Sequence, residues 1–213
     1  MEHLKTARRL LHPMSKDILI VCECSGVVRD AFRALGFNAY SCDLKPCETL
    51  GHSLFDSPYH LQMDVMKAIK LRRWDMIGLH PDCTAMAVSG NRWYGNGMPM
   101  NDKRIESVAW TKMLWNEAKS VCPHVYLENP VGVLFSQLDG HLQYVQPWQF
   151  GHGETKKTGL MLHGLAELEP TNIVDGREQR IWKMGPSENR KTERSRTFTG
   201  IGSAMADQWG RQI

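Results

Sequence analysis

The sequence predicts an α/β fold in which a mainly parallel sheet is covered by helices on both faces. Strand-like and helix-like segments alternate along the chain, and the strand-like segments are short, continuous apolar runs. Such runs are typical of strands that are buried on both faces. With 213 residues, of which 42% are hydrophobic, the chain can bury one core, so we expect a single domain over residues 1–213.

The first elements follow from the apolar pattern and from one glycine. In order, we expect a strand at 17–22, a helix at 27–35, a strand at 37–42, a strand end at 63–65 and a short helix at 66–70. The first helix has apolar residues at helical spacing, and Gly36 follows it, where a left-handed residue commonly ends a helix. A strand, a helix and a second strand in this order predict parallel strands.

The second half of the chain continues the alternation with longer connections. We expect a strand at 74–79, a mobile loop at 89–101, a helix at 102–120, a strand at 125–127, a strand pair within 146–165, a loop at 166–196 and a final helix at 204–209. Gly, Asn and Pro are frequent in the first of these loops, and Asn101 is the expected N-cap of the helix after it. Ligands of such sheets bind beyond the carboxyl ends of the strands.

Basic residues are concentrated near the C-terminus. Residues 177–196 contain seven Lys or Arg and three Glu, a charge of +4, whereas the whole chain carries +3. This segment suits contacts to phosphate groups, with Arg190, Lys191 and Arg194 as candidates. Arg92, in the glycine-rich loop, is a further candidate for contacting nucleic acid. A solvated loop is the alternative interpretation of the basic segment.

The composition also argues against several classes of protein. No run of 18 apolar residues suggests a transmembrane helix, and residues 1–15 lack the continuous apolar stretch of a signal peptide. The six cysteines show no CxxC spacing, so we expect reduced thiols, a cytoplasmic protein and no metal site. The alternative, zinc bound by cysteines, would use Cys22, Cys24, Cys42 and Cys47 and would block the turn described next.

A turn of small residues, Cys22-Glu23-Cys24-Ser25-Gly26, separates the first strand from the first helix. Such a turn lets the backbone approach a ligand, and the helix N-terminus offers free N–H groups. Asp43 ends the second strand, where an acid in folds that bind dinucleotides or S-adenosylmethionine accepts hydrogen bonds from ribose hydroxyls. Asp64 repeats this placement after the third strand. A ligand-free turn, an N-cap and surface acids are the alternatives.

A cysteine and a glutamate follow two later strands. Cys83 lies in Pro81-Asp82-Cys83-Thr84, after the strand at 74–79, and Glu128 follows the strand at 125–127. A helix N-terminus could lower the pKa of the thiol, although Asp82 would oppose this if it lay close. A carboxyl group that stays protonated could donate to a ring nitrogen. A buried structural thiol and a salt-bridged acid are the alternatives.

Taken in order, these motifs resemble the DNA cytosine-5 methyltransferase family, in a compact form like those found in phage and prophage genomes. The resemblance runs from about residue 17 to residue 210. The segment from Val21 to Phe37 is similar to the first cofactor motif of the family, and Asp43 and Asp64 stand at its ribose-binding and adenine-binding acids. Its nucleophile motif, Pro-Pro-Cys-Gln, is similar to Pro81-Asp82-Cys83-Thr84, and its Glu-Asn-Val motif to Glu128-Asn129-Pro130.

Two later segments continue the resemblance. Residues 149–158, which include Lys156 and Lys157, stand where the family has a Gln-Arg-x-Arg segment. Residues 199–206 resemble its last motif, Gly-Asn-x-Val-Pro, which closes the cofactor pocket. Between them, where the family houses a target-recognition domain, this chain has only a short basic insertion at 164–196.

The resemblance implies a Rossmann-like S-adenosylmethionine-dependent methyltransferase fold, with S-adenosyl-L-methionine as cofactor and DNA as substrate, in a bacterial host cell. It implies that the Cys83 thiolate adds to carbon 6 of a flipped cytosine, that Glu128 protonates ring nitrogen 3, and that carbon 5 then takes the methyl group. Lys156 and Lys157 join Cys83 and Glu128 as implied catalytic residues. The implied cofactor-binding residues are Cys22, Cys24, Ser25, Gly26, Asp43, Asp64, Pro81, Gly202 and Ser203.

Other functions remain open at this point. An enzyme that uses the same cysteine chemistry on a nucleotide or a modified cytosine would need the same Cys83 and Glu128. A non-catalytic relative that binds S-adenosylmethionine or DNA would need neither residue. A nicotinamide-dependent oxidoreductase would need a GxGxxG motif, which the first turn lacks. The sequence defines neither a target site nor an oligomeric state.

Overall fold

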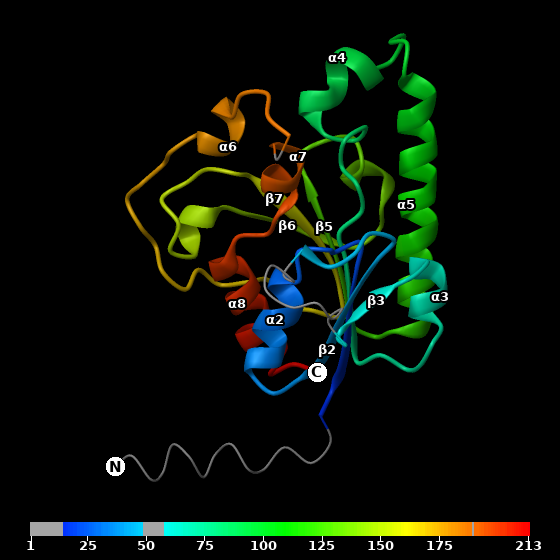
Figure 1. Cartoon of the computed structure of the whole chain (residues 1–213), viewed down its shortest axis with the longest axis vertical. Coiled ribbons are helices and arrows are strands. Elements are labelled where there is room, and N and C mark those ends of the chain that lie inside the picture. The colour runs from blue at the N-terminus through cyan, green and yellow to red at the C-terminus, as the bar shows by residue number, and fades with distance from the viewer. Residues whose placement is uncertain (1–14, 49–57, 189) are drawn as a thin grey trace.

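A seven-stranded sheet forms the centre of the computed structural model, which describes residues 15–48, 58–188 and 190–213 (Figure 1). The strands are β1 (Asp17–Val21), β2 (Asn38–Asp43), β3 (His60–Gln62), β4 (Met76–Leu79), β5 (Val125–Pro130), β6 (His141–Val145) and β7 (Thr158–His163). Their order is β3-β2-β1-β4-β5-β7-β6. The first five strands in this order are parallel, and β7 runs antiparallel to β5 and β6. The predicted mainly parallel α/β sheet is confirmed.

Helices cover both faces of this sheet (Figure 1). They are α2 (Val27–Ala34), α3 (Val65–Ile69), α4 (Asn91–Tyr94), α5 (Asn101–Val121), α6 (Arg180–Lys183), α7 (Arg190–Ser195) and α8 (Thr199–Trp209). Helices α2 and α8 pack together on one face, and α3 and α5 on the other. Helices α4, α6 and α7 lie beyond the carboxyl edge of the parallel strands, above the sheet in Figure 1.

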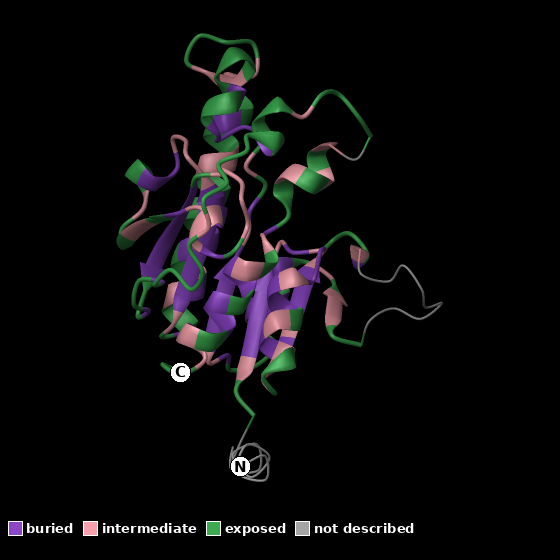
Figure 2. Ribbon diagram, turned by 90° about the vertical axis from the view of Figure 1, so that its left-hand side faces the viewer, coloured by how far each residue is buried: buried purple, intermediate pink, exposed green. Residues whose placement is uncertain are grey.

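The two faces of β1 explain why its sequence is continuously apolar. Ile18 and Ile20 pack in the layer that contains α2 and α8, whereas Leu19 and Val21 pack in the layer that contains α3 and α5. All four side chains are fully buried. Successive residues of a strand point to opposite faces, so a strand between two helix layers has no exposed side. Figure 2 shows the buried strands at the centre.

Gly78 of β4 leaves room for the side chain of Tyr126 in β5. The two residues are paired in the sheet, and a Cβ atom at position 78 would lie 2.5 Å from atoms of the Tyr126 ring. On its other side the ring packs against Trp209 of α8, with ring centroids 4.8 Å apart. These contacts fix the tyrosine within the core, close to the carboxyl edge of the sheet.

Several expected elements differ from those observed. The predicted strand pair within 146–165 is wrong in its first member, because β6 ends at Val145 and Pro147–Gln149 forms a 3-10 turn. Asn101 is not the N-cap of α5, which is Met100. The Asn101 side chain instead donates to the carbonyl oxygen of Tyr94 at 3.0 Å.

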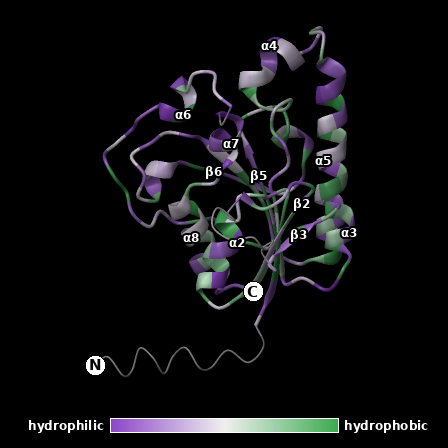
Figure 3. Ribbon diagram, in the orientation of Figure 1, coloured by the Kyte–Doolittle hydropathy of each residue, from purple (hydrophilic) through white to green (hydrophobic). Residues whose placement is uncertain are grey.

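Both predicted loops and the start of the last helix are more helical than expected. Helices α6 and α7 lie within the predicted loop at 166–196, α4 within the loop at 89–101, and α8 begins at Thr199 rather than at residue 204. The glycines at 200 and 202 disfavour a helix, but α8 packs on α2, and this packing overrides the local propensity. Figure 3 shows that the segment around α6 is largely hydrophilic. In the described part of the chain, no helix combines the length and apolar character needed to cross a membrane.

Candidate active site

The turn after β1 has an unusual backbone. Cys22 has a φ of 59°, and Gly26, which precedes α2, has a φ of 72°. A left-handed conformation costs a residue other than glycine on the order of 1–3 kcal/mol. The predicted ligand-binding turn therefore coincides with a strained residue at the carboxyl end of the central strand.

Glu23, which the sequence analysis does not single out, occupies the N-terminus of α2. Its carboxylate accepts hydrogen bonds from the backbone N–H of Val28 at 2.9 Å and from the hydroxyl of Ser25 at 3.2 Å. The expectation of free N–H groups at this helix end is therefore wrong for Val28. Burial raises the pKa of the Glu23 carboxyl, and these hydrogen bonds oppose the shift.

Three carboxylates gather around the turn. Burial raises the pKa of the Cys22 thiol, and the charges of Asp43, Asp82 and Asp64 raise it further. Asp43 at the end of β2 accepts the N–H of Lys45 through Oδ1 at 2.9 Å. Asp64 is the N-cap of α3 and accepts an N–H through Oδ1 at 3.1 Å. The acids predicted from separate strand ends thus converge on one region.

Cys83 lies directly beyond β4, in a loop that Asp82 stabilises. Oδ1 of Asp82 accepts the backbone N–H of Thr84 at 2.8 Å, and Oδ2 lies 2.8 Å from Nζ of Lys191. Burial raises the pKa of the Cys83 thiol to about 11; Glu128 and Asp82 also raise it, and Lys156 opposes them. The expectation that this thiol has a lowered pKa is therefore wrong, and the opposing effect of Asp82 is present.

Glu128 lies near the end of β5 and is buried. Burial raises the pKa of its carboxyl, and the charge of Lys156 opposes that shift. The next residue, Asn129, donates to the carbonyl oxygen of Pro81 at 3.2 Å, which joins the loops after β4 and β5. The structure thereby brings Cys83 and Glu128 into one electrostatically coupled site.

The two candidate lysines differ in their surroundings. Lys156 lines a small pocket with Glu128, and its Nζ donates to the carbonyl oxygen of Arg196 at 2.9 Å. Nζ of Lys157 lies over the ring of Tyr144 on β6, 4.3 Å from its centroid. Lys156 is therefore the lysine that the structure places beside the carboxyl group.

The two candidate residues of α8, Gly202 and Ser203, differ in burial. Gly202 is buried and faces Val27 and Ala31 of α2, with ordinary contact distances of 3.5–3.8 Å from its expected Cβ position. Ser203 is exposed. The structure thus places Gly202 in the packing between α8 and α2.

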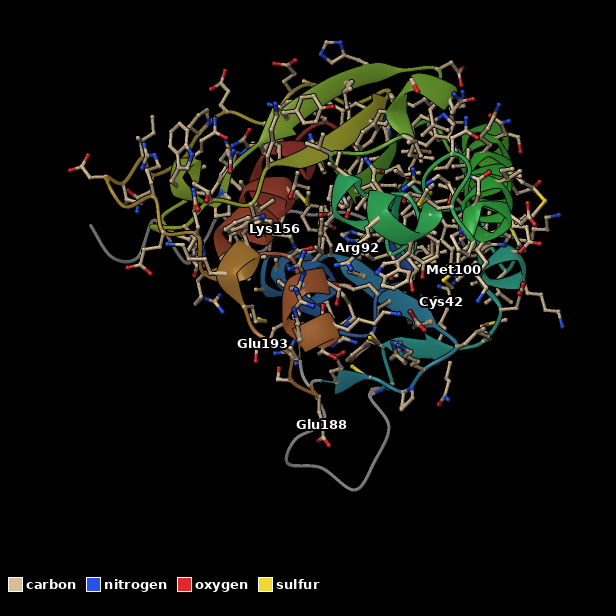
Figure 4. All side chains as sticks on the ribbon, turned by 90° about the horizontal axis from the view of Figure 1, so that it is seen from above. Cys42, Arg92, Met100, Lys156, Glu188 and Glu193 are labelled. Atoms are coloured by element: carbon tan, nitrogen blue, oxygen red, sulfur yellow. The ribbon has the colours of Figure 1, made fainter. Side chains whose placement is uncertain are left out.

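The basic candidates lie beyond the carboxyl edge of the sheet, the edge that faces the viewer in Figure 4. Lys156 and Arg92 are labelled on this face, with α7 close by. Arg194 of α7 donates to the carbonyl oxygen of Ile181 at 3.1 Å and so ties α7 to α6. Nε of Arg190 is buried without a hydrogen-bond partner among the described residues.

His80 and Tyr126 extend the site inward. Nε2 of His80 lies 2.8 Å from the hydroxyl of Tyr126, and Nδ1 lies 3.8 Å from Oε2 of Glu128. Burial, together with the charge of Lys156, lowers the pKa of His80 to about 3, so its ring is neutral. His80 adjoins the predicted Pro81–Thr84 motif, but only the pairing of β4 with β5 brings it to Tyr126.

The cysteines near the turn are free. The thiol of Cys24 donates to Glu48 at 3.2 Å, and that of Cys42 to the carbonyl oxygen of Met63 at 3.4 Å. Within residues 15–48, 58–188 and 190–213, no three His, Cys, Asp or Glu side chains are grouped so that they could hold a metal ion.

No family model and no curated protein matches this sequence. Among solved structures, the chain is similar to the Entamoeba histolytica methyltransferase EhMeth, with 12% identity and a TM-score of 0.50, over 83% of this chain and 62% of that chain. The prophage protein of E. coli described as a DNA modification methyltransferase has 15% identity and a TM-score of 0.45, over 81% and 56%. The S. pombe Dnmt2 methyltransferase has 10% identity and a TM-score of 0.46, over 80% and 54%.

This chain therefore spans between 54% and 62% of the length of these proteins. At such low identity the likeness concerns the fold. The match to EhMeth, together with the seven-stranded sheet, confirms the predicted Rossmann-like α/β fold.

Proposed function

We propose that this protein transfers a methyl group from S-adenosylmethionine to carbon 5 of cytosine in DNA, through a covalent adduct of Cys83. The observation that carries the proposal is the convergence at the carboxyl edge of the sheet: Glu128 and Lys156 line one pocket, and Asn129 joins the end of β5 to the loop of Cys83. A thiol, a carboxyl group and an ammonium group supply a nucleophile, an acid and a compensating charge. Ligands of α/β sheets bind at this edge.

The charge of Glu128 links its own protonation to that of the Cys83 thiol. An ionised Glu128 raises the pKa of the Cys83 thiol, so protonation of Glu128 makes the thiolate easier to form. Burial favours that protonated carboxyl group. The pair therefore favours one negative charge over two, and the state with a thiolate and a carboxylic acid is the one that can attack carbon 6 and protonate nitrogen 3 of cytosine.

The carboxylates near the first turn offer acceptor groups that suit the cofactor. Oδ1 of Asp43 accepts a local N–H, and its Oδ2 has no hydrogen-bond partner among the described residues, so it is available to a ribose hydroxyl. The carboxylates of Asp43, Asp64 and Asp82 also suit a cationic ligand. When bound, S-adenosylmethionine supplies an electrophilic methyl group. We assign its binding to these acids, to the turn and loop residues Cys22, Cys24, Ser25, Gly26 and Pro81, and to Gly202 and Ser203 of α8.

DNA contacts are assigned to the basic residues beyond the same edge. Arg190, Lys191 and Arg194 lie on α7, where Lys191 pairs with Asp82, the neighbour of Cys83 in the sequence, and Arg92 lies on α4 at the same edge. We further propose that the insertion at 164–196 replaces a target-recognition domain, and that the protein acts in the cytoplasm of a bacterial host and is of phage or prophage origin.

Tritium transfer tests the proposal. Methyl-labelled S-adenosylmethionine is incubated with mixed-sequence DNA and with wild-type protein or Cys83→Ala, and the nucleosides are separated. Label in 5-methylcytosine that is lost in the variant is expected. Cofactor binding by calorimetry should be nearly unchanged in Cys83→Ser, and equal loss of binding and turnover would contradict the assignment of Cys83 as nucleophile.

A wild-type protein that binds the cofactor but labels no DNA would contradict DNA methylation. The same assay with cytidine nucleotides and with DNA that contains modified cytosine then separates two cases. Label in either would identify the same cysteine chemistry on another substrate. Label in none would identify a binding protein.

A further inference from the structure

Three side chains that come from two neighbouring strands form a buried row behind the candidate catalytic centre. The row runs from Tyr126, within β5, to His80, which follows β4, and on to Glu128 near the end of β5. The hydroxyl of Tyr126 is 2.8 Å from Nε2 of His80, and Nδ1 of the same ring is 3.8 Å from Oε2 of Glu128. The side chains of His80 and Glu128 are 8% and 12% exposed.

The hydrogen atoms in this row can be assigned from the partners available. Among the described residues, His80 is the one hydrogen-bond partner of the Tyr126 hydroxyl. If Nε2 of His80 donated to that hydroxyl, the tyrosine hydrogen would be buried without an acceptor, which costs about 1–3 kcal/mol. The hydroxyl therefore donates to Nε2, and the neutral ring carries its hydrogen on Nδ1, which faces Glu128.

We infer that Tyr126 and His80 are positioning residues that decide which oxygen of Glu128 carries the acidic proton. The N–H at Nδ1 of His80 makes Oε2 of Glu128 the acceptor oxygen, which leaves the proton of the carboxyl group on Oε1. The inference rests on the proposed function, because it is the proton on Oε1 that would be donated to the cytosine ring.

The present separation of 3.8 Å between Nδ1 and Oε2 exceeds a hydrogen bond, and a shift of about 1 Å would close it. Catalytic hydrogen bonds are often long before the substrate binds and tighten afterwards. The row therefore orients the carboxyl group most strongly in the complex with substrate.

Burial favours the neutral form of all three members of the row, whereas the charge of Lys156 favours a neutral His80 but an ionised Glu128. Lys156 is the charged group that acts on both His80 and Glu128, and it disfavours a protonated imidazole. The charges of Glu23 and Glu128, with burial, raise the pKa of the Tyr126 hydroxyl, so it retains its hydrogen. Gly78 and Trp209 hold the tyrosine ring on its two sides.

The first test needs no enzymatic activity. Nitrogen NMR of protein labelled with ¹⁵N-histidine distinguishes the two neutral tautomers, and His80→Asn identifies the signal of His80. We expect the hydrogen on Nδ1 in the wild type, and a population with the hydrogen on Nε2 in Tyr126→Phe. Tyr40→Phe, which changes a tyrosine of β2, should leave the signal unchanged.

The second test separates positioning from structural support. The amide of His80→Asn places an N–H donor near the position of Nδ1, whereas that of His80→Gln places it near Nε2. We expect kcat for DNA methylation to fall by about tenfold to a hundredfold in Tyr126→Phe and His80→Gln, with KM nearly unchanged, and to be largely retained in His80→Asn. His124→Asn, a histidine at the opposite end of β5, is the matched control.

Either test can overturn the inference. A wild-type ring with its hydrogen on Nε2 would do so, as would equal losses of kcat in His80→Asn and His80→Gln. If the wild type methylated no DNA, the proposed function would fail, while the NMR result would still decide whether Tyr126 sets the tautomer that faces Glu128.

Discussion

The ammonium group of Lys191 lies 2.8 Å from the carboxylate of Asp82, although 109 residues separate them in the sequence. This pair joins α7, in the basic segment, to the loop that holds Cys83. Its two side chains are 65% and 59% exposed, so solvent screens the interaction and its contribution to folding is below about 1 kcal/mol. The pair therefore matters for the position of α7 beside the loop of Cys83, the proposed nucleophile, rather than for stability.

Lys191→Met should accordingly separate DNA binding from folding. The urea midpoint should stay close to that of the wild type. The dependence of log K on log salt concentration for duplex DNA should become shallower by about 1, the loss of one phosphate contact. Lys112→Met, an exposed lysine of α5, is the control, and a salt slope equal to that of the wild type would remove Lys191 from the DNA interface.

The rate at which Cys83 is alkylated should depend on the charged side chains near its thiol. Because burial and the nearby carboxylates raise the pKa of its thiol to about 11, iodoacetamide should react slowly at neutral pH and faster towards that value. Glu128→Gln removes a negative charge at alkaline pH and should speed the reaction, whereas Lys156→Met should slow it. A fall of one pKa unit gives about tenfold more thiolate.

Peptide mass spectrometry measures this reaction at each cysteine separately. Cys122 provides an internal control, because burial also raises the pKa of its thiol to about 11 and Glu128 is not among the groups that shift it. If Glu128→Gln accelerated both cysteines equally, the change would reflect loosened structure rather than a charge beside Cys83.

Gly78→Ala should destabilise the fold. The new Cβ would lie 2.5 Å from the ring of Tyr126, which Trp209 supports from the other side. Overpacking of a core in this way typically costs about 1–3 kcal/mol. Urea denaturation measures the loss, and Gly185→Ala, whose Cβ would meet no atom within 4 Å, should unfold like the wild type. Equal stability of both variants would mean that the tyrosine ring can move.

The strand ends could be predicted from the sequence, because the information is local. The apolar runs of β1, β4 and β5 are continuous; Glu128 directly follows the run Val125–Leu127 in β5, and Cys83 lies four residues after Leu79, the last residue of β4. Parallel pairing of β4 with β5 then brings these residues to one edge. Asp43 is the last residue of β2, which pairs in parallel with β1, so its place near the turn after β1 follows from the same reasoning.

Other features depend on contacts that a local pattern does not contain. The pairing of Tyr126 with Gly78 across two strands places the tyrosine hydroxyl beside His80. The antiparallel register of β5 and β7 and the loop before β7 decide that Lys156, and not Lys157, lies beside Glu128. Glu23 is held at the start of α2 by a buried hydrogen bond, in which its carboxylate accepts the N–H of Val28, five positions later.

The stability of the protein should depend on pH through Glu128. Burial raises the pKa of its carboxyl above the usual value of 4.5. A carboxyl group with a raised pKa contributes stability that is complete below the unfolded pKa and is lost as the pH rises through the folded pKa. Ionised Glu128 is therefore a cost at and above neutral pH, as functional groups in buried sites often are.

Glu128→Gln removes this cost. The variant should have a larger free energy of unfolding than the wild type at pH 8, and the difference should shrink as the pH falls and vanish only below 4.5, where the wild-type carboxyl becomes protonated in both states. Urea denaturation over this range measures it, with Glu106→Gln, an exposed residue of α5, as control. A difference that stayed constant with pH would indicate a packing effect. A variant that is more stable yet inactive in methyl transfer would show that this carboxyl group is retained for its proton.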